Sequence, residues 1–173
     1  QRLTPGDAPG LSECLLAGLV CNDSALVQKE GRWEAQGDPT EVALIVAARK
    51  AGLDGDAVKT RLPRVDAIPF ESQHQFMATL HEDAQGGRKL VYLKGAVEVV
   101  LDRCNVAFST QRQPIKLDRE RIQKHVSDLA ASGLRVLAFA RAELPAATQR
   151  ISAHSLPHQF TFLGLQGMID PPR

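Results

Sequence analysis

The sequence contains several strand-like runs in direct succession, and this feature limits the fold of the chain more than any other. They are rich in β-branched and other apolar residues, and Gly86-Gly87 is typical of a hairpin turn between two of them. The main runs are 65–70, 75–81, 89–94, 135–142 and 160–169. Because these runs do not alternate regularly with helices, we predict a two-layer α+β fold: an antiparallel β-sheet of about six or seven strands flanked by helices.

Helical patterns occupy several of the remaining segments. Apolar residues recur at helical spacing in 11–21, and the Asn22-Asp23-Ser24 turn ends that helix. In Gly37-Asp38-Pro39-Thr40-Glu41, Asp38 suits the N-cap, Pro39 the first helical position and Glu41 the third. The predicted helices are 11–21, 39–51, 96–103 and 118–131, and two short strands, 25–27 and 31–35, precede the second helix.

Length and composition describe a globular protein with a single domain, 1–173. Apolar residues make up 43% of the chain and charged residues 24%. The 21 basic and 20 acidic side chains give a net charge of +1, so nucleic acid is not predicted as a partner. The longest apolar runs, such as 42–48, are far shorter than the ~20 residues that cross a bilayer. Residues 1–6 lack the features of a secretory signal, which favours a cytosolic chain or an excised fragment.

The usual motifs for phosphate and metal binding are missing from the sequence. It contains neither Gly-x-x-x-x-Gly-Lys-Ser/Thr nor Gly-x-Gly-x-x-Gly, so side chains would have to hold any nucleotide. The five histidines form no pattern with zinc-ligand spacing. Cys14, Cys21 and Cys104 form no Cys-x-x-Cys pair, and we expect them to be reduced and buried.

Five segments, taken in order, carry a family resemblance. They are Gly37-Asp38-Pro39-Thr40-Glu41, Pro69-Phe70-Glu71-Ser72, Lys94-Gly95-Ala96-Val97-Glu98, Gly133-Leu134-Arg135-Val136-Leu137-Ala138 and Asp170-Pro171-Pro172-Arg173. Together they resemble the nucleotide-binding domain of P-type cation-transporting ATPases, in that family's order and over nearly the whole chain. The first segment and the compact length are more similar to calcium or sodium/potassium pumps than to heavy-metal pumps.

The resemblance implies an ATP site made by five residues. Glu41 accepts a hydrogen bond from the adenine amino group, and Phe70 stacks on the adenine ring. Lys94 lines the adenine pocket, Gly95 leaves room for the nucleotide, and Arg135 reaches the phosphates. The ligand would be Mg-ATP, with the Mg²⁺ held mainly by the nucleotide and by a separate phosphorylation domain.

Each of these side chains also has a purely structural interpretation. Glu41 could close a capping box by accepting from the Asp38 backbone. Phe70 could be a core residue at the end of an apolar strand. Lys94 could be solvated, and Arg135 could face solvent or pair with a carboxylate.

The sequence departs from the family pattern at two places, and its last residues resemble the family's hinge. His74 and Gln75 stand where calcium pumps carry a basic pair near the phosphates, so no phosphate contact is assigned to Gln75. Val97 replaces the usual proline of its segment. Asp170, Pro171 and Pro172 form a stiff segment that resembles the hinge, 170–173, leading back to the phosphorylation domain.

The sequence contains no Asp-Lys-Thr-Gly-Thr segment, which carries the phosphorylated Asp in this family. We therefore expect a domain that binds ATP without hydrolysing it alone and presents the γ-phosphate to the phosphorylation domain, with the actuator domain as a further partner. It would be a monomeric cytoplasmic domain of an integral membrane protein, without membrane contact of its own. The alternatives are a small self-sufficient hydrolase, for which no Gly-x-Ser-x-Gly motif is found, and a ligand-free interaction module.

Overall fold

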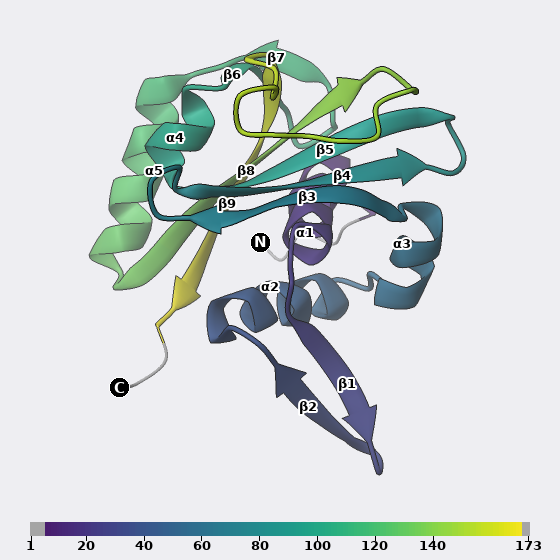
Figure 1. Cartoon of the computed structure of the whole chain (residues 1–173). Coiled ribbons are helices and arrows are strands. Elements are labelled where there is room, and N and C mark those ends of the chain that lie inside the picture. The colour runs from purple at the N-terminus through teal and green to yellow at the C-terminus, as the bar shows by residue number, and fades with distance from the viewer. Residues whose placement is uncertain (1–5, 171–173) are drawn as a thin grey trace.

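A computed structural model defines the fold of residues 6–170, and a seven-stranded β-sheet forms its centre (Figure 1). The strands are β3 (Arg64–Glu71), β4 (Phe76–Asp83), β5 (Arg88–Gly95), β6 (Cys104–Phe108), β7 (Pro114–Lys116), β8 (Leu134–Leu144) and β9 (Phe160–Ile169). Their order is β3-β4-β5-β8-β9-β6-β7, and all neighbours are antiparallel except β6 and β9. The predicted α+β fold with an antiparallel sheet flanked by helices is therefore confirmed.

Helices cover both faces of this sheet. The helices are α1 (Pro9–Val20), α2 (Pro39–Lys50), α3 (Gly55–Arg61), α4 (Val97–Leu101) and α5 (Arg119–Ala131). Figure 1 shows α1 to α3 on one side of the sheet and α4 with α5 on the other. There is thus one helical layer on each side of the sheet, where the sequence predicted a single one. Within residues 6–170, no helix has the length and apolar character needed to cross a bilayer.

Side chains along the central strands point alternately to the two faces of the sheet, and each face has its own hydrophobic core. In β4 and β5, every second residue faces the α4–α5 side, and the residues between them face α1 and α2. The α4–α5 core contains Phe76, Leu80, Val91, Leu93, Leu101 and Phe160. The α1–α2 core contains Leu16, Leu44, Met77, Leu90, Tyr92 and Phe139. Side chains on the α1–α2 face of the sheet therefore point toward the start of α2, which carries the predicted site residue Glu41.

The helix α1 buries a face that its leucines did not predict. Leu11 is 36% exposed, whereas the small residues Gly10 and Gly18 are buried. A Cβ on Gly10 would lie 2.1 Å from the backbone oxygen of Ser109, so glycine allows the helix to touch the β6–β7 turn. Buried Glu13 then joins α1 to the sheet, with its Oε2 3.2 Å from Nη1 of Arg141. These contacts hold the N-terminal half of α1 against the sheet and the β6–β7 turn.

A small hairpin projects beyond α2 (Figure 1). It consists of β1 (Ala25–Lys29) and β2 (Arg32–Gln36), which pair antiparallel as predicted. The elements α3, β6 (Cys104–Phe108) and β7 were not predicted from the sequence. The helix α3 has seven residues and buries none of them, and β7 has three exposed residues, so neither carries an apolar pattern.

The three cysteines are free and buried, as predicted. Burial raises the pKa of the Cys14 and Cys104 thiols to about 12 and that of Cys21 to about 11. These thiols are therefore protonated at neutral pH and act as small packing groups.

Candidate functional site

The start of α2 places a carboxylate above the sheet. The Asp38 side chain caps the helix, because its Oδ1 accepts from the backbone N–H groups of Thr40 at 2.8 Å and Glu41 at 3.2 Å. Pro39 at the first helical position has no N–H to satisfy there. Glu41 is therefore held in the first turn, where a negative charge is favoured by the helix dipole.

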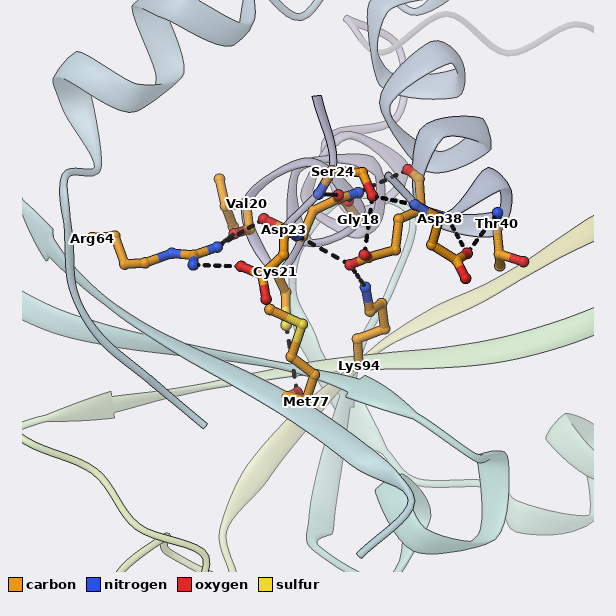
Figure 2. Close-up of polar contacts among 12 residues, drawn as sticks. Gly18, Val20, Cys21, Asp23, Ser24, Asp38, Thr40, Arg64, Met77 and Lys94 are labelled. Carbon is orange, nitrogen blue, oxygen red and sulfur yellow. Dashed lines mark hydrogen bonds and ion pairs between the residues drawn. The ribbon is translucent and has the colours of Figure 1, made fainter. Parts of the chain in front are cut away.

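Lys94 meets this carboxylate from the sheet. It is the next-to-last residue of β5, and its cross-strand neighbours are Met77 in β4 and Phe139 in β8. Its Nζ lies 2.8 Å from Oε2 of Glu41, and the two side chains are only 9% and 20% exposed. Figure 2 shows Lys94 rising from the sheet toward the turn that contains Asp38 and Thr40. The interpretation of Lys94 as a solvated residue is therefore wrong.

The turn that ends α1, which carries Asp23 and Ser24 (labelled in Figure 2), supplies the other partners of the Glu41 carboxylate. The backbone N–H of Asp23 donates to Oε2 of Glu41 at 3.1 Å, and the Ser24 hydroxyl donates to Oε1 at 3.1 Å. The Asp38 backbone N–H donates to Ser24 Oγ at 2.9 Å. The capping-box interpretation of Glu41 is therefore wrong, because Ser24 takes the N–H that the box would use. From the sequence, this turn was predicted only to end a helix.

Phe70 lies near the end of β3, at the same edge of the sheet as Lys94. The register joins Glu71 to Phe76 and Phe76 to Gly95, so the ends of β3 and β5 are two strand spacings, about 10 Å, apart. The Phe70 side chain is 60% exposed. It is therefore not the core residue that an apolar strand end suggested, and its ring is available for stacking.

Gly95 has a packing role of its own. A Cβ at this position would lie 2.4 Å from the backbone oxygen of Gln75 and 2.9 Å from Cα of Phe76. The same Gln75 oxygen accepts from the Ala96 N–H at 3.0 Å. Glycine thus allows the turn between β3 and β4 to close against the end of β5, which keeps the Phe70 strand end beside Lys94.

Arg135 lies farther along the same face of the sheet. Alternation along β8 places it on the face of Leu137 and Phe139, which pack with the α1–α2 core. It is four residues from Phe139, the cross-strand partner of Lys94, or about 13 Å along the strand. The side chain is exposed, and within residues 6–170 its guanidinium has no hydrogen bond or ion pair.

The turn between β3 and β4 contains His74 and Gln75, the first of the two departures from the family pattern. Nε2 of His74 lies 3.6 Å from Oε2 of Glu71, and its ring lies 5.8 Å from that of Phe76. Gln75 is exposed and adopts the left-handed conformation, with φ of 57°. At the other end of the chain, Asp170 of the predicted hinge is exposed, and Pro171 and Pro172 lie outside the described residues.

A large cavity lies elsewhere. It has a volume of about 910 Å³ and is bounded by the β1–β2 hairpin, α3 and the start of β3. Within residues 6–170, none of Glu41, Phe70, Lys94, Gly95 and Arg135 lines it, although Asn22, Asp23 and Ser24 form part of its wall. The five predicted site residues therefore lie outside this cavity.

Comparison with known proteins assigns the family. Residues 10–173 match the family described as "P-type ATPase, cytoplasmic domain N". The chain is 45% identical to a cation-transporting ATPase of Synechocystis sp., over 99% of this chain and 19% of that protein. It is 33% identical to a calcium-transporting ATPase of Bacillus subtilis, over 100% of this chain and 19% of that protein. It is 37% identical to a sodium/potassium exporting P-type ATPase of Schizosaccharomyces pombe, over 95% of this chain and 16% of that protein. The chain thus spans less than a fifth of the length of these relatives, and it belongs to the family of the cytoplasmic N domain of P-type ATPases.

Proposed function

We propose that this chain is the ATP-binding part of a P-type cation-transporting ATPase and that it presents the γ-phosphate to a catalytic Asp in a separate phosphorylation domain. The observation that carries the proposal is the ion pair between Glu41 and Lys94, beside the exposed Phe70. Glu41 and Lys94 come from α2 and β5, and the β3 strand end that carries Phe70 lies about 10 Å from the end of β5.

The chemistry of this edge suits an adenine ring. A half-exposed phenyl ring offers a stacking surface that is worth roughly 1–3 kcal/mol against a purine base. The Glu41 carboxylate is an acceptor for the 6-amino group, and its hydrogen bond from Lys94 holds it in place. Gly95 contributes by allowing the β3–β4 turn to close toward this edge.

Arg135 suits the other end of the nucleotide. Its side chain is exposed on the same face, about 13 Å along β8 from the level of Lys94, and a planar fork of donors matches phosphate oxygens. The Mg²⁺ ion would be held mainly by the triphosphate and the phosphorylation domain. Among residues 6–170, no group of three His, Cys, Asp or Glu side chains is arranged to hold a metal ion.

The proposed role is to position ATP for a reaction completed by a neighbouring domain. Phosphoryl transfer depends largely on positioning and electrostatic stabilisation, so a domain that orients the triphosphate contributes to catalysis without a nucleophile of its own. One stack and a few hydrogen bonds, less the cost of association, leave about −4 to −5 kcal/mol, or a Kd of roughly 0.2–1 mM. Weak binding suits a nucleotide that must also contact a second domain.

Titration of the purified chain with ATP, followed by amide NMR, tests the proposal. We expect shifts around Glu41, Phe70, Lys94 and Arg135 that saturate near millimolar ATP, and no steady release of phosphate. Phe70→Ala should remove most of the response while the spectrum stays that of a folded domain, because the side chain is exposed. An unchanged response in this variant would refute the stacking contact, and steady ATP hydrolysis would refute the need for a second domain.

A further inference from the structure

The Ser24 side chain joins the turn that follows α1 to the start of α2. Its Oγ accepts the Asp38 backbone N–H at 2.9 Å, and its hydroxyl donates to Oε1 of Glu41 at 3.1 Å. A hydroxyl has a single proton, so with the Asp38 N–H directed at its oxygen, that proton is committed to Glu41. Ser24 thus holds Oε1 of Glu41 in one orientation and occupies one of its two acceptor sites.

The two oxygens of Glu41 are unequally occupied. Oε2 already accepts from Lys94 Nζ at 2.8 Å and from the Asp23 backbone at 3.1 Å, whereas among the described residues, 6–170, Oε1 accepts only from Ser24. A carboxylate offers about four acceptor sites, two on each oxygen. The free site is therefore on Oε1, the oxygen held by Ser24.

The turn that carries Ser24 is itself held firmly. The Asn22 side chain donates to the backbone oxygens of Gly18 at 3.0 Å and Glu41 at 2.8 Å, and it accepts from the Ser24 N–H at 2.8 Å. Arg64 donates to the backbone oxygen of Asn22 at 2.8 Å and to Oδ1 of Asp23 at 2.7 Å. These contacts reach the turn from α1, α2 and β3, so the position of the Ser24 hydroxyl is set before any ligand binds.

A glycine leaves the space that this hydroxyl needs. A Cβ on Gly37 would lie 2.3 Å from Ser24 Oγ, and Gly37 has a φ of 110°, which side-chain-bearing residues rarely adopt. The backbone just before α2 therefore requires glycine at position 37 to leave room for the Ser24 side chain.

We propose that Ser24 is a positioning residue that directs Oε1 of Glu41 toward the 6-amino group of the bound purine and thereby makes the site selective for 6-aminopurine nucleotides. The inference rests on the proposed ATP site. A 6-oxo purine would bring an oxygen against a carboxylate that has no proton to donate, so correct orientation of Glu41 penalises it. Ser24 itself does not touch the nucleotide.

A purely structural role for Ser24 makes a different prediction. If the hydroxyl only held α2 in place, its loss would weaken the binding of every nucleotide to the same extent. If it acts through Glu41, its loss affects only ligands that carry the 6-amino group, and only while Glu41 is present.

The test measures Kd by NMR titration for ATP and for the purine ribonucleoside triphosphate that lacks the 6-amino group. The proteins are the unaltered chain, Ser24→Ala, Glu41→Ala and the double variant. Ser109→Ala is the matched control, because its hydroxyl also accepts backbone N–H groups in a turn, at the opposite end of α1. Far-UV circular dichroism and thermal unfolding check that each variant is folded.

We expect Ser24→Ala to weaken ATP binding about five- to tenfold, the loss of roughly one hydrogen bond, and to leave the analogue unchanged. In the Glu41→Ala background, Ser24→Ala should have no further effect, and Ser109→Ala should bind both ligands normally. Equal losses for both ligands, a loss that persists without Glu41, or no loss at all would each overturn the role of Ser24. If the unaltered chain binds ATP and the analogue equally, the contact of Glu41 with the amino group is refuted and the inference with it, while ATP binding stands. If it binds neither ligand, the proposed function fails as well.

Discussion

Removal of Lys94 should destabilise the domain far more than removal of an exposed lysine. The change Lys94→Met keeps the aliphatic stem and leaves the Glu41 carboxylate without its cation. Breaking a buried ion pair on one side costs ~3–5 kcal/mol. Glu41 is 20% exposed and keeps its bonds from Asp23 and Ser24, so the lower end, about 3 kcal/mol, applies.

Urea unfolding, followed by circular dichroism, measures this cost as a change in the free energy of unfolding. For a domain of this size, a loss of about 3 kcal/mol corresponds to a fall in Tm of about 6–12 °C. The matched control is Lys29→Met, because Lys29 pairs with Glu34 at 3.2 Å but the two side chains are 60% and 53% exposed. We expect the control to cost less than about 1 kcal/mol.

A double-mutant cycle with Glu41→Gln separates the pair from other effects of each change. If Lys94 and Glu41 stabilise the fold through each other, the double variant should lose clearly less than the sum of the two single variants. A loss in Lys94→Met no larger than that in Lys29→Met, or strictly additive losses, would refute the argument that a buried ion pair holds α2 against the sheet.

Three further outcomes follow from the geometry. His81 is buried, with Nδ1 2.9 Å from the Leu62 oxygen, so Nδ1 carries the proton, and burial lowers the His81 pKa from 6.5 to about 4. The unfolded chain therefore gains a proton first as the pH falls, and stability should drop by up to about 3 kcal/mol between pH 6.5 and 4. Urea unfolding across this range should show a flatter pH dependence in His81→Gln; an identical slope would contradict the assignment. Arg135→Ala should weaken ATP binding several-fold and leave adenosine binding unchanged in NMR titrations; an equal effect on both would exclude a phosphate contact. Gly95→Ala should destabilise the domain by about 1–3 kcal/mol, measured by urea unfolding, because its Cβ would meet the Gln75 oxygen at 2.4 Å; a neutral result would contradict the close approach of the β3–β4 turn.

Local sequence patterns predicted most of the elements because each of them satisfies a local rule. Asp38 and Pro39 begin α2 as expected, and Gly86-Gly87 marks the turn between β4 and β5. The helix α3 and the strand β7 were missed because they bury no side chain, so their sequences carry no periodic apolar pattern. The leucine pattern of α1 predicted its helical conformation, but the buried face also contains Gly10, Glu13 and Gly18, which no apolar pattern marks.

The identity of the candidate site residues came from motif order, whereas their partners came only from the structure. Glu41 fitted a capping box in sequence, but a carboxylate bonds to whichever donors the fold brings near it. Those donors are Lys94, 53 positions away, and the turn at Asp23 and Ser24. No local rule connects such distant segments, because their separation depends on the packing of α1 and α2 on the sheet.

The sequence by itself determined the α+β class, the start of α2 and the absence of a glycine-rich phosphate loop, since these depend on neighbouring residues. The tertiary structure alone decided that Phe70 is exposed, that Lys94 is buried and paired, and that Ser24 holds Oε1 of Glu41. Whether a side chain is buried, and which donor a carboxylate meets, depend on which face of the sheet is covered. That coverage is set by contacts between segments far apart in the chain, such as buried Glu13 in α1 with Arg141 in β8.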